Sequence, residues 1–218
     1  MFSNKYTNRL FGRTRGRSKK KINLKSYYEK VDKYKFQYFN EKSEYILDVG
    51  TGYGETSIFL AKQFPEKVII SCEKYIDGNI ILLKNIEKNK INNIKLHNGN
   101  VYNVLEITNK KYFGLVWIFF PDPWPKNRHA KRRLINSDFL IKLHNILKDN
   151  GEIYIATDSM IYVRFILNSF YKCKDYFLWV NQSKINLSIK DYFDIETKYY
   201  KKAINSQRNP SLFILRKL

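Results

Sequence analysis

Apolar residues follow two alternating patterns from about residue 45 to the end of the chain. Short, nearly continuous apolar runs indicate buried strands, and they lie at 45–49, 67–72, 94–97, 114–120, 151–156 and 212–215. Between several of these runs, apolar residues recur every three or four positions, which predicts helices within 57–64, 80–86, 139–147 and 160–170. This regular alternation predicts an α/β fold with a doubly wound, mainly parallel sheet and helices on both faces.

The first 28 residues differ in composition from the rest of the chain. They contain no Asp or Glu, and they include three consecutive lysines and glycines at positions 12 and 16. Such a segment cannot bury enough apolar surface to pack, so we expect a mobile basic arm over residues 1–28 and a single domain over residues 29–218. An organellar transit peptide is the alternative, because such peptides are rich in Arg and poor in acidic residues. The segment lacks Ala and an amphipathic stripe, however.

Other features concern the compartment in which the protein acts. No apolar run reaches the length of a membrane span, and the N-terminus has no apolar signal-peptide core. Cys72 and Cys173 do not have the spacing of metal ligands, so we expect reduced structural cysteines. These observations predict a cytoplasmic protein that needs no metal.

The formal net charge of +20 suggests a polyanionic partner. Many lysines can reflect the codon bias of an AT-rich genome, so arginine is the more informative cation. Seven of the ten arginines form two clusters, at positions 9, 13, 15 and 17 and at positions 128, 132 and 133. Because a guanidinium group matches phosphate with two hydrogen bonds, nucleic acid is favoured over an acidic membrane surface.

The most informative segment directly follows the apolar run at 114–120. Pro121, Asp122, Pro123 and Trp124 place a carboxylate between two prolines whose φ angles are restricted. Open α/β sheets place their chemistry at the carboxyl ends of strands. A basic segment follows at once, with Lys126, Arg128, His129, Lys131, Arg132 and Arg133. The pattern favours a reactive site for a polyanionic substrate over a Pro-rich surface loop with solvated charges.

A second candidate site lies in the first turn between strand and helix, at Asp48, Gly50, Gly52 and Gly54. Glycines let the backbone turn sharply and approach a ligand closely. The spacing of a dinucleotide site is absent, because position 55 is Glu. The second strand ends at Glu73, whose carboxylate suits the hydroxyls of a ribose. The pattern favours an adenosyl cofactor without a pyrophosphate, and a tight helix–strand junction is the alternative.

Together these motifs resemble class I S-adenosylmethionine-dependent methyltransferases. The string from Phe119 to Arg133 closely resembles one family, the bacterial tRNA (guanine-N7)-methyltransferases, often called TrmB. Supporting matches at 9–17, 156–158 and 197–199 extend the resemblance over essentially the whole chain. It implies a seven-stranded Rossmann-like fold, S-adenosyl-L-methionine as cofactor, and methyl transfer to N7 of guanosine 46 in the tRNA variable loop. It implies no protein partner.

The resemblance also assigns candidate site residues. Cofactor contacts carry over to Asp48, Gly50, Gly52, Gly54, Glu73, Asn100 and Asp122. Contacts to guanine or tRNA carry over to Lys126, Arg128, His129, Lys131, Arg132, Arg133, Asp158, Thr197, Lys198, Tyr199 and Tyr200. Three positions depart from the family pattern, in which Asp48, Asn100 and Tyr200 are usually Glu, Asp and Glu. At Tyr200 a carboxylate is lost, so we expect Asp122 and Asp158, or the nearby Asp194 or Glu196, to compensate.

The chemistry of guanine N7 indicates what such a site must do. N7 has an in-plane lone pair and no proton, so its methylation needs in-line placement rather than a general base. Asp122 and Asp158 are the candidate catalytic residues, because carboxylates stabilise the positive charge that moves onto the purine. Asp158 is alternatively a helix N-cap, and Trp124 either stacks on a base or packs on its own turn. Two other function classes remain open: a methyltransferase with a different acceptor, and a non-catalytic tRNA-binding relative.

Overall fold

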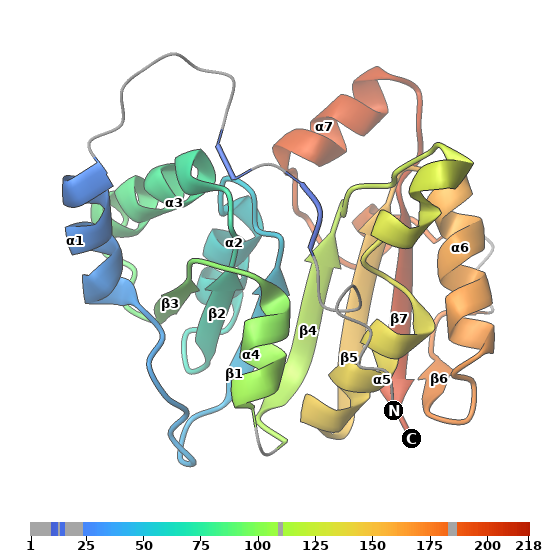
Figure 1. Ribbon diagram of the computed structural model, residues 1–218, viewed down its shortest axis with the longest axis horizontal. Coiled ribbons are helices and arrows are strands. Elements are labelled where there is room, and N and C mark those ends of the chain that lie inside the picture. Colours follow the sequence, from blue (N-terminus) through green and yellow to red (C-terminus); the bar gives the residue numbers. More distant parts are fainter. Residues whose placement is uncertain (1–9, 13, 16–23, 109–110, 183–186) are drawn as a thin grey trace.

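A seven-stranded sheet forms the centre of the computed structural model, and helices cover both of its faces (Figure 1). The structure describes residues 10–12, 14–15, 24–108, 111–182 and 187–218. The order across the sheet is β3-β2-β1-β4-β5-β7-β6, with β1 (Tyr45–Val49), β2 (Val68–Cys72), β3 (Ile94–His97), β4 (Phe113–Phe119), β5 (Leu147–Thr157), β6 (Phe177–Trp179) and β7 (Ser211–Lys217). Strands β1 to β5 pair in parallel, whereas β7 is antiparallel to β5 and β6. The expected seven-stranded, mainly parallel sheet is confirmed.

The central strands are mostly apolar because both faces of the sheet are covered. All five residues of β1 are buried. Successive side chains of a strand point to opposite faces, so Leu47 belongs to one core cluster while Ile46 belongs to the other. In the same way, Val116 and Trp117 of β4 enter different clusters. This arrangement explains why the sequence shows continuous apolar runs rather than strict alternation.

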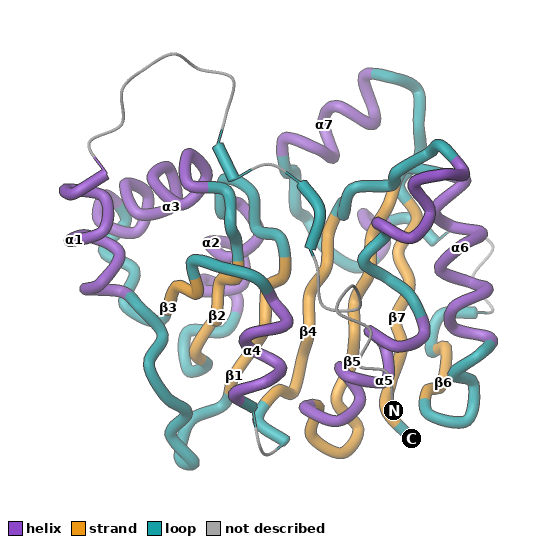
Figure 2. The backbone as a smooth tube through the Cα atoms, in the orientation of Figure 1, coloured by secondary structure: helices purple, strands orange, loops and turns teal. Residues whose placement is uncertain are grey.

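Two groups of helices cover these two faces (Figure 2). The face with Leu47 packs against α4 (Val101–Ile107), α5 (Ser137–Ile146) and α6 (Met160–Tyr171). The face with Ile46 packs against α1 (Leu24–Tyr34), α2 (Glu55–Gln63), α3 (Ile76–Lys88) and the short 3₁₀ segment η2 (Ile189–Asp191). A second 3₁₀ segment, η1 (Asn127–Arg132), and helix α7 (Lys198–Asn205) lie beyond the carboxyl ends of the parallel strands, at the top of Figure 1.

All four helices expected from the apolar spacing are present, but some elements were not predicted. Strand β6 has only three residues, which is too short for a recognisable pattern. Helix α1 begins at Leu24, inside the segment expected as an arm over residues 1–28. Most of that segment lies outside the described residues, so its mobility stays a prediction.

The part of the chain that the structure describes contains no helix long and apolar enough to cross a membrane. Cys72 and Cys173 are buried and carry free thiols, as expected. Burial raises the pKa of both thiols. Both cysteines therefore stay protonated, as structural residues do.

Candidate active site

One cavity of about 640 Å³ opens at the carboxyl ends of β1, β2 and β4. This volume lies within the range of roughly 300–1,000 Å³ typical of small-molecule sites. Its walls come from the glycine turn after β1, the ends of β2, β3 and β4, the start of α7, and the N-terminal residues Leu10, Phe11 and Gly12. Segments far apart in the sequence therefore meet at this edge of the sheet.

The glycine turn after β1 forms the floor of the cavity. Gly50, Gly52 and Gly54 have φ angles of 73°, 56° and 81°, in the left-handed region that favours glycine. The turn also packs tightly on α3, because a Cβ added to Gly54 would lie 2.5 Å from Cδ1 of Leu82. Glycine is therefore needed at all three positions for the backbone conformation, and at Gly54 also for close packing on Leu82.

Three of the expected cofactor residues, Asp48, Gly54 and Asn100, are not among the residues that line the cavity. Asp48 is 1% exposed, and its Oδ2 accepts hydrogen bonds from Thr56 Oγ1 at 2.7 Å and Ser57 Oγ at 2.6 Å. Asp48 therefore ties the end of β1 to the start of α2, and burial raises its pKa to about 7. Asn100 caps α4 instead, because its Oδ1 accepts a hydrogen bond from the main-chain N–H of Tyr102 at 3.1 Å.

Glu73 lines the cavity at the end of β2. One carboxylate oxygen accepts the N–H of Gly52 at 2.9 Å, and the other accepts the N–H of Tyr75 at 2.8 Å. Burial raises the pKa of Glu73 despite these hydrogen bonds. The side chain is thus fixed against the glycine turn, while each oxygen keeps lone-pair capacity for a ligand.

The segment Phe120–Trp124, here called the Asp122 turn, lies on the opposite wall. Its carboxylate is exposed, and Asp122 lines the cavity. Phe120 and Trp124 have φ angles of 53° and 42°, a backbone conformation that is strained for bulky side chains. Asp122 is therefore presented between two strained residues.

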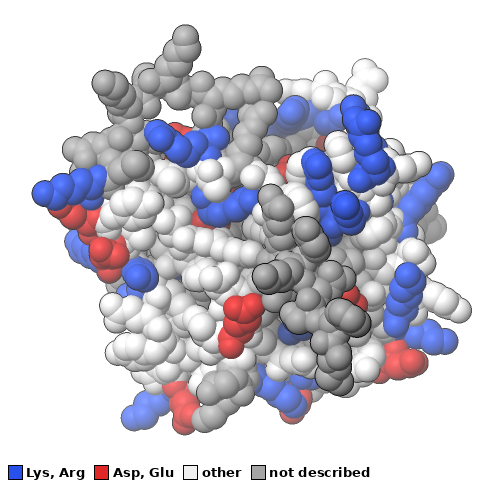
Figure 3. Space-filling view, in the orientation of Figure 1, with Lys and Arg blue, Asp and Glu red and all other residues white. Residues whose placement is uncertain are grey.

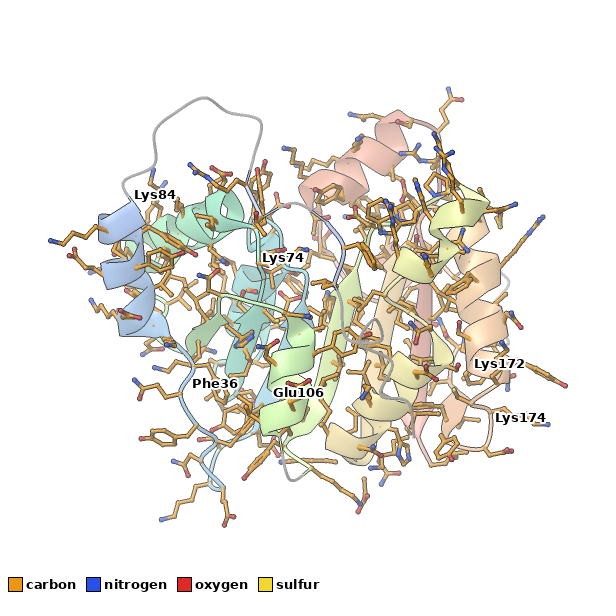
Figure 4. The ribbon with its side chains drawn as sticks, in the orientation of Figure 1. Phe36, Lys74, Lys84, Glu106, Lys172 and Lys174 are labelled. Carbon is orange, nitrogen blue, oxygen red and sulfur yellow. The ribbon has the colours of Figure 1, made fainter. Side chains whose placement is uncertain are left out.

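The N-terminal segment lies against the Asp122 turn. A Cβ added to Gly12 would lie 3.4 Å from Oδ2 of Asp122 and 3.7 Å from Nζ of Lys74. Lys74 donates a hydrogen bond to the carbonyl of Leu10 at 2.9 Å, and Figure 4 shows Lys74 at the upper edge of the sheet, near the start of α3. The Phe11 ring meets Trp124 edge-on, with centroids 6.5 Å apart. Trp124 therefore packs on Phe11 and also lines the cavity. No periodic pattern in the sequence predicted these N-terminal contacts.

The basic segment after the turn divides into exposed and inward-facing residues. Lys126, Arg128 and Lys131 are exposed. His129 meets Trp124 edge-on at 5.7 Å, and the Arg132 guanidinium lies 4.9 Å from the Trp124 ring centroid. Arg132 itself lines the cavity.

Arg133 was expected to contact tRNA, but the structure places it inside the protein. It is only 7% exposed, and its guanidinium donates hydrogen bonds to the main-chain carbonyls of Pro123 and Trp124. A side chain committed in this way inside the protein is not available to a phosphate. Its guanidinium binds the backbone of the Asp122 turn instead.

Asp158 also lies outside the cavity lining. Its Oδ2 accepts a hydrogen bond from Nε of Arg208 at 2.8 Å, a partner that sequence reasoning missed because 50 residues separate the two. The N-cap of α6 is Ser159, whose hydroxyl accepts the N–H of Tyr162. The alternative that Asp158 caps this helix is therefore wrong.

The four candidate residues at the start of α7 have different environments. Thr197 is the buried N-cap of the helix, and the ammonium of Lys198 lies 4.4 Å from the Tyr53 ring centroid. Tyr199 lines the cavity, and its ring lies 6.4 Å from that of Phe120 at an interplanar angle of 25°. Tyr200 packs against the core instead.

The two acids expected to compensate for Tyr200 are engaged elsewhere. Lys190 donates to Asp194 at 2.7 Å and to Glu196 at 3.3 Å. Glu196 also pairs with Lys201. Neither acid lines the cavity. Asp122, which does line it, is therefore the better candidate to compensate for the carboxylate lost at Tyr200.

The strand order and the cavity, with its glycine turn and acidic residues at the ends of β2 and β4, define a class I methyltransferase. A family model described as "Putative methyltransferase" matches residues 42–211. A tRNA (guanine-N(7)-)-methyltransferase from Neorickettsia sennetsu is 37% identical over 164 residues, covering 74% of each chain. The chain belongs to this tRNA (guanine-N7)-methyltransferase family.

Two further proteins are similar to this chain, one in sequence and one in structure. A bifunctional methyltransferase from Rickettsia conorii is 33% identical over 99% of this chain, which spans only 41% of that protein's length. The solved structure of a methyltransferase homologue from Pyrococcus horikoshii has a TM-score of 0.59 at 16% identity, covering 88% of this chain and 66% of its own. At that identity the likeness supports the fold alone.

The buried carboxyl of Asp48 predicts a pH-dependent stability. Its pKa rises from 3.8 to about 7 on folding, so the folded state binds this proton more tightly than the unfolded state between pH 4 and 7. Stability is therefore lost as pH rises through this window. Between pH 4 and 7, the free energy of unfolding of the wild type, measured in urea, should fall by up to about 4 kcal/mol relative to that of Asp48→Asn. The exposed Asp175→Asn is the control, and parallel curves for wild type and Asp48→Asn would contradict the assignment.

The position of Gly12 predicts a specific effect on cofactor binding. Its φ is 129°, and a Cβ at this position would contact the Asp122 carboxylate, so Gly12→Ala strains the backbone at the cavity wall. Strain on the order of 1–3 kcal/mol corresponds to roughly tenfold or greater loss of affinity for S-adenosylmethionine, measured by calorimetry. Gly114→Ala is the matched control, because a Cβ there meets nothing within 4 Å. Equal affinities for the two variants would show that Gly12 is not part of the site.

Proposed function

We propose that the protein transfers the methyl group of S-adenosylmethionine to N7 of guanosine 46 in the variable loop of tRNA. The observation that carries this proposal is a single cavity that joins Glu73 and the glycine turn on one wall to the Asp122 turn on the other. The name of the Neorickettsia sennetsu relative supports tRNA as the substrate. A tRNA substrate also agrees with a cytoplasmic location.

The residues of the cavity fit S-adenosylmethionine. Glu73 accepts the ribose hydroxyls, because it lines the cavity and backbone N–H groups orient both of its oxygens. Gly50 and Gly52 let the ligand approach the backbone closely, while Val49 and Val101 supply apolar walls. When bound, S-adenosylmethionine supplies a methyl group on a positively charged sulfur.

The protein contributes placement and charge rather than proton transfer. Phe120 and Tyr199 place two aromatic rings at the cavity, and unpaired bases stack on such rings. Burial, followed by the charge of Asp122, raises the pKa of Tyr199, so its hydroxyl remains a hydrogen-bond donor. Asp122 stabilises the positive charge that develops on the purine. Asp158 is paired with Arg208 outside the cavity lining, so Asp122 is the better placed of the two candidate carboxylates.

Exposed cations surround the cavity and suit the phosphates of tRNA. Arg128 and Lys131 lie in η1 and Lys126 directly precedes it, while Lys198, Lys201 and Lys202 lie in α7. Figure 3 shows Lys and Arg side chains gathered towards the upper right, where η1 and α7 lie. These two segments flank the cavity and would hold the RNA backbone on both sides of the target base.

The direct test of this function is mass spectrometry of nucleosides from tRNA incubated with protein and S-adenosylmethionine. The wild type should produce 7-methylguanosine. Asp122→Asn keeps the shape of the side chain but removes its charge, so turnover should fall by about 100-fold while the cofactor still binds. Asp149→Asn, at an exposed acid, is the control.

Each alternative function gives a different result in the same experiment. Methylated adenosine or cytidine would indicate another acceptor. Binding of tRNA without any methylated product would indicate a non-catalytic relative.

The basic η1 segment predicts the salt dependence of tRNA binding. Arg128→Ala and Lys131→Ala should each weaken binding to all tRNAs to the same extent. Each should also lower the slope of log affinity against log salt by about one unit. Lys172→Ala is the control, since this exposed lysine lies at the far end of α6 (Figure 4). Filter binding from low to moderate salt measures the slopes, and unchanged slopes would show that η1 does not contact phosphate.

A further inference from the structure

Arg133 directly follows η1 and is almost completely buried. Its Nε donates to the carbonyl of Pro123 at 3.0 Å, and its Nη2 donates to the carbonyl of Trp124 at 3.1 Å. The guanidinium carbon lies 4.7 Å from the ring centroid of Phe165 in α6. One planar group therefore connects α6 with two consecutive carbonyls of the Asp122 turn.

Among the described residues, carbonyl oxygens and an aromatic ring, rather than a carboxylate, contact the charge of Arg133. The ion pairs among the described residues do not include Arg133. Burying a cation costs free energy unless its donors are satisfied. Here the carbonyl oxygens and the aromatic ring offset that cost. Both of these hydrogen bonds stabilise the backbone of the Asp122 turn.

That turn needs such support because it is strained. Trp124, whose carbonyl Arg133 holds, has a φ of 42°, and Phe120 at the start of the turn has a φ of 53°. A bulky residue in the left-handed region costs on the order of 1–3 kcal/mol and persists only when its surroundings enforce it. The two hydrogen bonds from Arg133 act at the strained end of the segment that presents Asp122.

The two neighbouring arginines thus have different roles. Arg132 lies over the Trp124 ring at 4.9 Å and lines the cavity, whereas Arg133 faces inward to the carbonyls. We propose that Arg133 is a positioning residue for methyl transfer, which holds the backbone of the Asp122 turn so that the carboxylate faces the cavity. This inference rests on the function proposed above.

Arg133→Lys tests the proposal, because an ammonium keeps the charge but lacks the planar pair of donors. The expected result is a fall in kcat of about 10- to 100-fold, as for a small misplacement of a reacting group. The KM for tRNA and the salt slope should stay unchanged. Arg164→Lys is the matched control, since Arg164 is exposed on α6. An unchanged kcat would overturn the proposal, and a lower salt slope would reassign Arg133 to the RNA interface.

A second measurement separates this inference from the proposed function. Hydrogen exchange of a peptide covering residues 118–126 should become faster in Arg133→Lys and remain unchanged in Arg164→Lys, whether or not the wild type methylates tRNA. An inactive wild type with this exchange pattern would reject the proposed function but support Arg133 as the residue that holds the Asp122 turn. Unchanged exchange in Arg133→Lys would reject the positioning role of Arg133. If Arg133→Lys does not fold, Arg133→Gln, which keeps one amide donor, gives the same comparison.

Discussion

The pairing of β1 with β4 is the constraint on which the rest of the site depends. These strands run in parallel in the middle of the sheet, with Leu47 opposite Val116 and Asp48 opposite Trp117. The chain proceeds from β1 to β2 and β3 on one side, and from β4 to β5 on the other. The connections after β1 and β4 therefore leave for opposite faces and open a crevice between them. The glycine turn and the Asp122 turn meet there because of this topology, although about 70 residues of sequence separate them.

The cations of this chain serve two purposes that net charge alone does not distinguish. Arg133 and Lys217 are buried, and both donate to main-chain carbonyls. Lys217 binds the carbonyls of His144 and Leu147 at the end of α5, where the helix leaves such groups without partners. The exposed cations of η1 and α7 suit RNA phosphates instead. A charge of +20 thus overstates the surface available to nucleic acid.

The sequence predicted the sheet well because its central strands are buried on both faces and read as continuous apolar runs. It also placed Glu73 and Asp122 at strand ends, and both do line the cavity. The direction of a side chain at a strand end was less predictable. Asp48 and Asn100 bond to helix starts behind the cavity, and Arg133 turns inward while its neighbour does not. The contact of Leu10 with Lys74 and the pairing of Asp158 with Arg208 join distant segments, so no local pattern could reveal them.

A crystal structure of the protein with S-adenosylhomocysteine would show whether Glu73 and the Asp122 turn hold the cofactor as proposed. We expect the ribose hydroxyls to bind the Glu73 carboxylate and the sulfur to face the Asp122 turn, with Arg133 still bound to the carbonyls of Pro123 and Trp124. A ligand seated away from Glu73, or a sulfur directed away from Asp122, would contradict it.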